Sequence, residues 1–425
     1  MSAHDHGAVD REIARLLSRG VTSSSPEHRD LWDAFARAAD GGKRFRPALL
    51  TATHGALGGG REVAAVQVAA ALELLHTAFV VQDDVIDGDP TRRGVPSLPG
   101  SFAQDVQQRG ASPAAAQRYG EAAGILAGDL GLLAAFRAIA RCEAPAPVVD
   151  RLLDLVETTV HDSAVGELAD VRLQLDLRSE LHPDQTEQSS ETAQSSQTAQ
   201  SAALRDALAV AEFKTAVYSF QFPLHAGALL ADAEDATLAA LDEIGSLLGI
   251  GFQLFDDLLG LFGEERRTGK SALGDLREGK RTALIAHATT TAQWRQLQPL
   301  LGRPDLDAED ARRARTLLTD SGSRAWTEEL ARWHLTSAVS SAIRHRLPAA
   351  LVHALSTATE EILRTADLLL PSQPSSAPGP EADPAESLPA PRPDGDTSPY
   401  RGPAYRDSTR AAPAHRSPAT TGSTS

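Results

Sequence analysis

The stretch that decides the fold is REVAAVQVAAALELLHTAFVVQDDVID, residues Arg61–Asp87, a long apolar segment that ends in three aspartates. It is rich in Ala and Leu, which lose little rotamer freedom in a helix, and it is too long and too poor in alternation for a strand. A second stretch of this kind, Ala236–Phe262, contains GFQLFDDLLG at Gly251–Gly260. Both stretches are predicted to be helices that carry an acidic pair near their C-terminal ends.

The same apolar periodicity, broken by short polar segments, runs through most of the 425 residues, and aromatic residues make up only 4%. We therefore expect an all-α protein. One helical domain is expected at 26–370, after an N-terminal extension at 1–25. Within it, a Gln/Ser/Thr tract at 179–202 is expected to be a mobile low-complexity loop. Residues 371–425 have the Pro/Ser/Ala-rich composition of a disordered tail.

The composition also limits the possible partners and location. A formal net charge of -16 argues against nucleic-acid binding, which requires a basic surface. The single cysteine, Cys142, excludes an intramolecular disulfide and suits a reducing cytoplasm. The first residues, MSAHDHGAVDREIARLL, are charged, and we find no uninterrupted apolar run of membrane-spanning length. The sequence predicts a cytoplasmic protein with no stable membrane insertion and no nucleic-acid partner.

The first acidic cluster has the spacing of a metal site. Asp83 and Asp87 are four residues apart and project from one helical face, with Asp84 beside them. Carboxylates at the end of a buried helix need a partner, because uncompensated burial of charge is costly. Oxygen ligands of this kind suit Mg²⁺. One such cluster alone is as readily a solvated acidic helix end, but two clusters on two apolar helices favour a metal site.

The second acidic pair, Asp256 and Asp257, has different neighbours. Gln253 lies three residues before Asp256 on the same helical face, and Gly260 stands where the first cluster has Asp87. The second cluster therefore offers fewer charged ligands. We interpret Gly260 as the loss of an outer or dispensable carboxylate.

Lysine is rare, and its positions indicate a polyanion site. Of the 41 basic residues only four are lysines, namely Lys43, Lys214, Lys270 and Lys280. Each lies in a polar break between predicted helices, within GGKRFRP, FKT or TGKSALGDLREGKRT, and TRRG adds Arg92 and Arg93 after the first acidic cluster. Both Lys and Arg bind phosphate, Lys as a point charge and Arg as a planar fork. Four leftover surface lysines would not show this clustering.

These motifs together resemble those of the trans-isoprenyl diphosphate synthases, the polyprenyl synthetase family, and most nearly bacterial geranylgeranyl diphosphate synthases. The matching segments are GGKRFRP, HTAFVVQDDVID with TRRG, GELAD, FKT, GFQLFDDLLG and TGKSALGDLREGKRT, in the family's order from Gly41 to Thr282. The resemblance implies an isoprenoid-synthase-type helical bundle around a central cavity, usually a homodimer. It also implies Mg²⁺-dependent, head-to-tail condensation of isopentenyl diphosphate with an allylic diphosphate.

The resemblance also implies roles for individual residues. The metal ligands would be Asp83, Asp84, Asp87, Asp256 and Asp257, which with Lys214 form the catalytic set. The allylic diphosphate would be bound by Arg92, Lys214, Thr215, Gln253 and Lys270, with Lys280 closing the last motif. Isopentenyl diphosphate would be bound by Lys43, Arg46, His76 and Arg93. For His76, a buried structural histidine is the alternative interpretation.

Product length depends on the residues one turn before Asp83. The resemblance implies that an aromatic side chain there stops chain growth, and this sequence has Phe79 but a small Ala78. An opening beside Ala78 favours geranylgeranyl diphosphate over farnesyl diphosphate. Two other functions stay open, a class I terpene cyclase and a non-catalytic subunit of a heteromeric prenyl synthase. The second aspartate pair and the lysine set favour the synthase over both.

Overall fold

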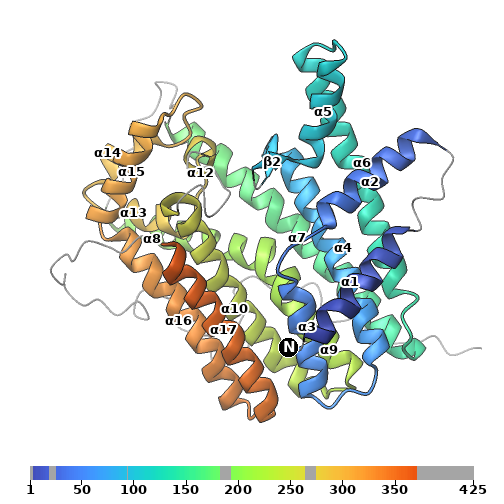
Figure 1. Cartoon of the computed structure of the whole chain (residues 1–425). Helices are drawn as coiled ribbons and strands as arrows, with labels where there is room; N and C mark the ends of the chain where they lie inside the picture. The colour runs from blue at the N-terminus through green and yellow to red at the C-terminus, as the bar shows by residue number, and fades with distance from the viewer. Residues whose placement is uncertain (1–2, 19–24, 93, 182–192, 264–273, 371–425) are drawn as a thin grey trace, which may run out of the picture. The chain divides into compact units, whose positions relative to one another are not determined.

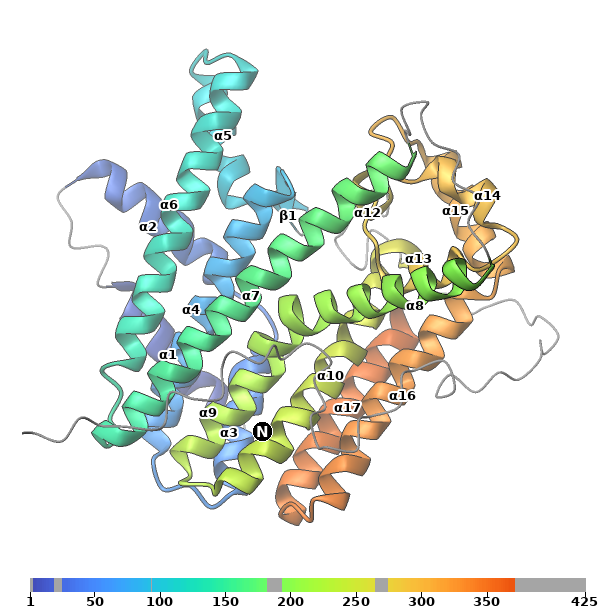
Figure 2. The same ribbon diagram turned by 180° about the vertical axis from the view of Figure 1, so that it is seen from behind.

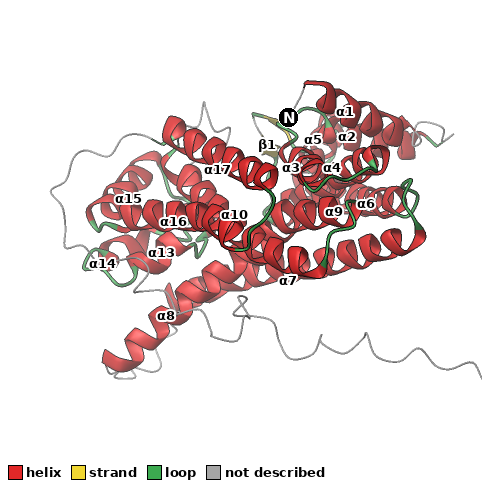
Figure 3. Ribbon diagram, turned by 90° about the horizontal axis from the view of Figure 1, so that it is seen from below, coloured by secondary structure: helices red, strands yellow, loops and turns green. Residues whose placement is uncertain are grey.

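Helices make up most of the residues that the computed structural model describes, as Figure 3 shows, and the predicted all-α class is confirmed. The structure describes residues 3–18, 25–92, 94–181, 193–263 and 274–370. These residues lie within one compact unit, whereas the predicted tail at 371–425 lies outside the described residues.

The elements before residue 182 are seven helices and one short hairpin among the described residues. They are α1 (Ala3–Leu17), α2 (Pro26–Ala39), α3 (Phe45–Ala56), α4 (Glu62–Ile86), β1 (Thr91–Arg92), β2 (Val95–Pro96), α5 (Leu98–Gln108), α6 (Pro113–Ile139) and α7 (Ala146–Leu181). Strands β1 and β2 pair antiparallel, directly after the acidic end of α4.

The elements from residue 193 onward include one π-helix, η2, and one 3₁₀ turn, η3. They are α8 (Ala193–Val210), η2 (Ala211–Gln221), α9 (Phe222–Leu230), α10 (Asp235–Phe262), α12 (Gly274–Glu278), α13 (Ala283–Ala288), α14 (Trp294–Leu297), η3 (Gln298–Leu300), α15 (Ala308–Asp320), α16 (Ser323–Arg344) and α17 (Ala349–Leu369).

Helix α4 is the core of the N-terminal half, where it contacts α1, α3, α6 and α9 (Figure 1). Helix α10 takes the same place in the C-terminal half and lies beside α16 and α17. Between them, η2 contacts both α7 and α10, and Figure 2 shows α7 running past α4 toward α8. The acidic ends of α4 and α10 are thus connected through η2 and α7.

Many helices begin at the residues that elementary capping rules predict. Ser25, Ser97 and Ser112 each accept a hydrogen bond from a backbone N–H in the first turn of the helix that follows, and proline occupies an early position in all three. Both features satisfy or remove backbone donors that have no partner inside the helix. The local sequence therefore defines the starts of α2, α5 and α6.

The prediction that residues 1–25 form an extension outside the helical domain is wrong for the described residues 3–18, which belong to that domain. Helix α1 buries Val9, Ile13 and Leu16 in the same apolar core as α4. The indole N–H of Trp32 on α2 also donates to the carbonyl of Leu17. Apolar residues at helical spacing make one face of this helix part of the domain.

The predicted loop at 179–202 is wrong at both ends. Helix α7 continues to Leu181 and α8 begins at Ala193, while 182–192 lie outside the described residues. A polar Ala/Gln/Ser/Thr segment can extend an existing helix, because propagation costs much less than nucleation. Low apolar content therefore did not indicate a loop here.

The expectation that the chain has no apolar run of membrane-spanning length is also wrong. Within the described residues, α4, α6 and α10 are long enough and apolar enough to cross a membrane, judged by length and composition alone. The share of the apolar window buried inside the protein is 67% for α4, 56% for α10 and 39% for α6. Packing thus covers most of the apolar surface of α4 and α10, whereas α6 leaves more of it exposed.

Three glycines let the helices around η2 approach closely. A Cβ atom on Gly249 of α10 would lie 2.3 Å from the Cα atom of Ala216, and one on Gly166 of α7 would lie 2.5 Å from the backbone nitrogen of Lys214. Gly245 meets Gln221 in the same way, with 2.9 Å to its Cα atom. The position of η2 between α7 and α10 therefore requires residues without side chains.

We expect Gly249→Ala to lower the free energy of unfolding by about 1–3 kcal/mol, since the added methyl group overpacks a backbone contact. Gly55→Ala is the matched control, because Gly55 is exposed on α3 and a Cβ atom there meets nothing within 4 Å. In that control the free energy of unfolding is expected to rise by up to about 1 kcal/mol. Urea unfolding of both variants measures the difference, and equal stabilities would contradict the close packing of η2.

Candidate active site

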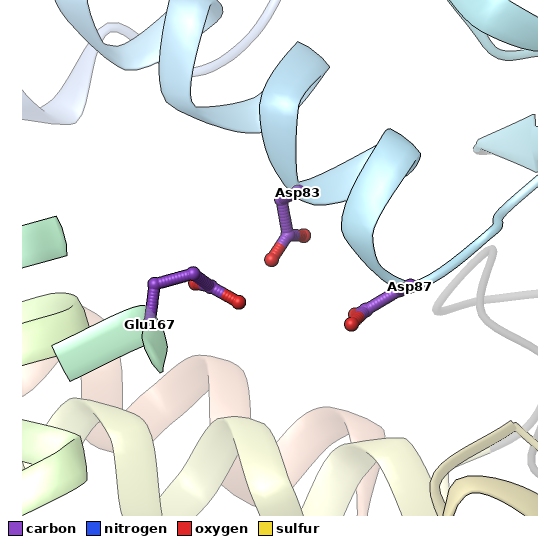
Figure 4. Close-up of side chains that lie close together, drawn as sticks. All are labelled: Asp83, Asp87 and Glu167. Atoms are coloured by element: carbon purple, nitrogen blue, oxygen red, sulfur yellow. The ribbon is translucent and has the colours of Figure 1, made fainter. Parts of the chain in front are cut away.

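Three carboxylates from two helices converge at the end of α4. Asp83 and Asp87 project from α4 toward Glu167 of α7, as Figure 4 shows, and one oxygen atom of each lies within 4.8 Å of the others. The side chains of Asp83 and Glu167 are half-buried, and that of Asp87 is only 7% exposed. Carboxylate oxygens at this separation are the ligands that hard divalent cations prefer.

Lys214 of η2 connects these carboxylates. Its Nζ atom lies 3.3 Å from Asp83, 3.1 Å from Glu167 and 2.8 Å from Asp170, which is on α7. Removal from water alone would lower the pKa of Lys214, but the charges of Asp170, Asp83 and Glu167 outweigh this and raise it. Lys214 is therefore a permanent cation inside a group of carboxylates.

Asp84 has a different environment from Asp83. It is buried, and its carboxylate accepts from the Nε atom of Arg92 in β1 at 2.6 Å. Arg92 also reaches Asp83 at 3.1 Å. Burial raises the pKa of Asp84 to about 6, although the charge of Arg92 opposes the rise. Asp84 is not among the converging carboxylates in the described part of the chain, so its role as a metal ligand stays a prediction.

Lys280 also reaches the acidic end of α4. Its Nζ atom lies 3.2 Å from Asp87, 2.9 Å from Glu278 and 3.6 Å from Asp275. Lys280 thus joins α12 to α4, as Lys214 joins η2 to α4.

The second acidic pair lies on α10 and is connected to η2. The Nε2 atom of Gln253 donates to Asp257 at 2.7 Å, and its Oε1 atom accepts from the hydroxyl of Thr215 at 2.6 Å. Removal from water raises the pKa of Asp257 to about 8, Gln253 opposes the rise, and the charge of Asp256 adds to it. Neither Asp256 nor Asp257 belongs to the converging group on α4 and α7 in the described residues, so a metal site shared by both pairs stays a prediction.

The carboxylate of Asp275 lies beside Gly260, the position where the second acidic cluster lacks a side chain. A Cβ atom on Gly260 would lie 2.4 Å from the Oδ2 atom of Asp275 on α12. Asp275 therefore places a carboxylate where a side chain at 260 would extend, and its charge also contributes to the raised pKa of Asp257.

A third group of side chains surrounds Tyr218 of η2. The guanidinium of Arg46 lies 5.0 Å from the centre of the Tyr218 ring and also donates to the hydroxyl of Ser219 at 2.9 Å. His76 stacks on the same tyrosine ring at 5.8 Å between centroids, and Phe79 meets it edge-on at 5.2 Å. Arg46 and His76 thus lie around one aromatic ring, and their role in binding isopentenyl diphosphate stays a prediction.

The remaining predicted site residues fall into two kinds. Lys43 lies exposed in the turn before α3. Arg93 and Lys270 lie outside the described residues, so nothing is added to their predicted roles.

The opening expected beside Ala78 is not what the structure shows. Ala78 is fully buried, and a Cβ atom on Gly131 of α6 would lie 3.0 Å from the Ala78 Cβ atom and 2.4 Å from the ring of Phe35. Phe35 on α2 and Gly131 therefore fill the space that a small residue at 78 leaves. Phe79, in contrast, faces Tyr218.

Five residues of these groups were missed by sequence reasoning: Glu167, Asp170, Tyr218, Ser219 and Asp275. Glu167 and Asp170 lie three residues apart in GELAD, a spacing that puts two acids on one helical face and could have identified them. Tyr218 lies four residues after Lys214, a spacing that shares one face in an α-helix as well and could have pointed to it. Ser219 gave no such signal, because it lies five residues after Lys214 and approaches that face only in the wider turn of a π-helix.

The donor set fits a hard divalent cation. The oxygen atoms of Asp83, Asp87 and Glu167 lie close enough to bind one ion, and the surrounding cations leave an excess of negative charge. Lys214, Lys280 and Arg92 each contact Asp83 or Asp87 and so add fixed positive charge beside these carboxylates. Such a combination in an all-α bundle defines a metal-dependent enzyme whose substrate carries strong negative charge.

The chain belongs to the polyprenyl synthetase family, whose sequence model matches residues 30–318, and it is a prenyltransferase. It is 30% identical over 310 residues to the geranylfarnesyl diphosphate synthase of Aeropyrum pernix, covering 73% of this chain and 85% of that protein. It is 30% identical over 330 residues to the geranylgeranyl diphosphate synthase of Methanosarcina mazei, covering 78% and 85%.

The fold is similar to that of a solved relative from Corynebacterium glutamicum. That protein is a geranylgeranyl pyrophosphate synthase complexed with isoprenyl diphosphate and magnesium. The similarity has a TM-score of 0.69 at 26% identity and covers 83% of this chain and 96% of that chain. The predicted family and helical fold are therefore confirmed.

We expect the raised pKa of Asp257 to make the metal-free protein less stable as the pH rises. The folded protein keeps this proton up to about pH 8, whereas an unfolded aspartate, with its ordinary pKa of 3.8, has lost it. The unfolded chain therefore binds fewer protons, and stability falls between about pH 4 and pH 8. In urea unfolding with a chelator, Asp257→Asn is expected to gain stability over the wild type, increasingly up to pH 8. Asp150→Asn, exposed on α7, is the control, and a gain independent of pH would contradict the assignment.

Proposed function

We propose that the protein condenses isopentenyl diphosphate with an allylic diphosphate, head to tail, to give geranylgeranyl diphosphate. The observation that carries the proposal is the position of Lys214 on η2, between Asp83 of α4 and the two acids of α7. Membership of the polyprenyl synthetase family and the names of the relatives support it. The metal would be Mg²⁺, which is present in the similar structure from Corynebacterium glutamicum.

Mg²⁺ would be held by Asp83 and Asp87, with Asp256 and Asp257 from α10, and Glu167 lies within reach of the first two. When bound, it supplies Lewis-acid stabilisation of the leaving diphosphate. Lys214 and Arg92 contribute fixed positive charge beside the same aspartates, and this charge is most valuable where water is excluded.

The remaining contacts would position the two substrates. Lys43, Arg46 and His76 would bind isopentenyl diphosphate, while Thr215, Gln253 and Lys280 would lie along the allylic diphosphate. The allylic C–O bond breaks and diphosphate leaves with the bonding electron pair. The isopentenyl double bond then attacks the resulting allylic cation, and the departing diphosphate takes up the proton that the new product loses. Tyr218 and Phe79 present aromatic rings close to Arg46 and His76, and such rings stabilise a nearby cation. No side chain acts as a nucleophile in these reaction steps.

We propose geranylgeranyl diphosphate rather than a shorter or longer prenyl diphosphate as the product. The Methanosarcina mazei and Corynebacterium glutamicum relatives bear that product in their names. Phe79, facing Tyr218, is the aromatic residue in place to limit chain growth. Because Ala78 packs close to Gly131 and Phe35, the small side chain at 78 does not by itself make room for a longer product.

The direct test incubates the purified protein with Mg²⁺, isopentenyl diphosphate and each allylic diphosphate in turn, followed by chromatography of the dephosphorylated products. We expect a C20 alcohol as the main product, and Asp83→Asn is expected to lower kcat by about a hundredfold or more through loss of a charged ligand. Asp150→Asn is expected to retain activity. Cyclised products would support a terpene cyclase, and no product would support a non-catalytic subunit; either result contradicts the proposal.

We also propose that the protein is a homodimer formed through α6 and α7. These neighbouring helices expose Leu126, Leu133, Val165 and Leu168 to between 53% and 72%. Exposed apolar residues in such number on two adjoining helices are typical of a protein interface. A second copy of the same surface would bury them through a two-fold contact.

Light scattering after size exclusion tests this interface. The wild type is expected at twice the chain mass of 44.9 kDa, and Leu126→Glu with Leu168→Glu is expected at the mass of one chain. Ile343→Glu is the control, because Ile343 is 62% exposed on α16. A wild type that runs as one chain would contradict the proposal.

We further propose that the protein acts in the cytoplasm, in keeping with its single, buried and unpaired cysteine. Fractionation of the cells that produce it tests this, and recovery with membranes or outside the cell would contradict it.

A further inference from the structure

The turn before α3 contains an unusual backbone conformation. In GGKRFRP, Gly41 and Gly42 have φ values of +77° and +86°, which glycine adopts readily, but Arg44 also has a positive φ of +49°. A left-handed conformation is unfavourable for a residue with a Cβ atom and persists only where its surroundings hold it. Something other than local preference therefore holds Arg44 in place.

The side chain of Arg44 provides that restraint. Its Nη1 atom contacts Glu73 of α4 at 2.8 Å, and its Nε atom contacts Asp10 of α1 at 2.9 Å. Arg44 is 10% and Glu73 only 8% exposed, whereas Asp10 is 53% exposed. The pair with Glu73 is thus shielded from solvent and is the stronger of the two restraints.

These contacts connect two parts of the proposed active site. Glu73 lies ten residues before Asp83 on the same rigid helix, about 15 Å along its axis. On the other side, Arg44 lies between Lys43 and Arg46, and Arg46 is in turn hydrogen-bonded to Ser219 of η2. The distance between the turn and the aspartates of α4 is therefore fixed through Arg44.

We propose that Arg44 is a positioning residue, which through Glu73 and Asp10 sets Lys43 and Arg46 at the distance from the α4 aspartates that condensation requires. This rests on the proposed function, in which Lys43 and Arg46 bind isopentenyl diphosphate. Arg44 itself touches no substrate in this account. Helix α1 then has a role in binding, because it carries Asp10 and is anchored on α4 by Val9, Ile13 and Leu16.

Steady-state kinetics on the full-length protein separate this role from a merely structural one. Arg44→Lys keeps the charge but loses the fork that bonds two acids, and Glu73→Gln removes the buried partner charge. Both are expected to raise KM for isopentenyl diphosphate by about tenfold, in line with the cost of small misplacements. KM for the allylic diphosphate and kcat are expected to change little. Asp10→Asn should give a smaller effect in the same direction.

Arg61→Lys is the matched control. Arg61 also joins two segments, through Asp232 at 2.7 Å and the carbonyl of Leu230 at 2.8 Å, but at the opposite end of α4. All three substitutions, Arg44→Lys, Glu73→Gln and Arg61→Lys, are expected to lower the melting temperature. Arg61→Lys is expected to leave the KM values for both substrates unchanged.

Two results would overturn the inference: an unchanged KM for isopentenyl diphosphate in Arg44→Lys and Glu73→Gln, or an equal rise in Arg61→Lys. A wild type that fails to elongate any allylic diphosphate would instead refute the proposed function, and the role of Arg44 with it.

Discussion

The rest of the site depends on one shared ammonium group. Lys214 lies within ion-pair distance of Asp83 on α4 and of Glu167 and Asp170 on α7. Half-buried carboxylates so close together repel one another, and a cation held among them makes their common position possible. This single side chain thus connects segments that lie far apart in the sequence. A divalent cation would relieve the remaining negative charge, which is why the arrangement suits a metal and a diphosphate.

The π-helix η2 extends this organisation to the other groups. Lys214 and Tyr218 share one face through their four-residue spacing, and the wider turn of the π-helix brings Ser219 toward the same face. The same element therefore contacts both the α4 carboxylates and the guanidinium of Arg46. Thr215 adds the hydrogen bond to Gln253 and thus to the second acidic pair on α10. Glycines on α7 and α10 allow η2 to lie this close to both helices. Close backbone packing and site chemistry are therefore linked in this part of the fold.

Much of this could be predicted from the sequence, because its signals are local. The helical period placed Asp83 and Asp87 on one face, and the scarcity of lysine drew attention to Lys214 and Lys280. What could not be predicted depends on contacts across the fold or on a change of helical period. The π-helix brought in Ser219, packing from α2 and α6 closed the space beside Ala78, and Asp275 took the place opposite Gly260. Each depends on a neighbour that is distant in the sequence.

The central claim is that the carboxylates gathered around Lys214 form one metal and diphosphate site. Crystals grown with Mn²⁺ in place of Mg²⁺ and with a non-hydrolysable allylic diphosphate analogue test it most directly, because Mn²⁺ gives an anomalous signal. The account predicts an anomalous peak bound by Asp83 and Asp87, with the diphosphate contacting Lys214 and Arg92. Peaks only at other acidic groups, or a diphosphate bound away from Lys214, would contradict it.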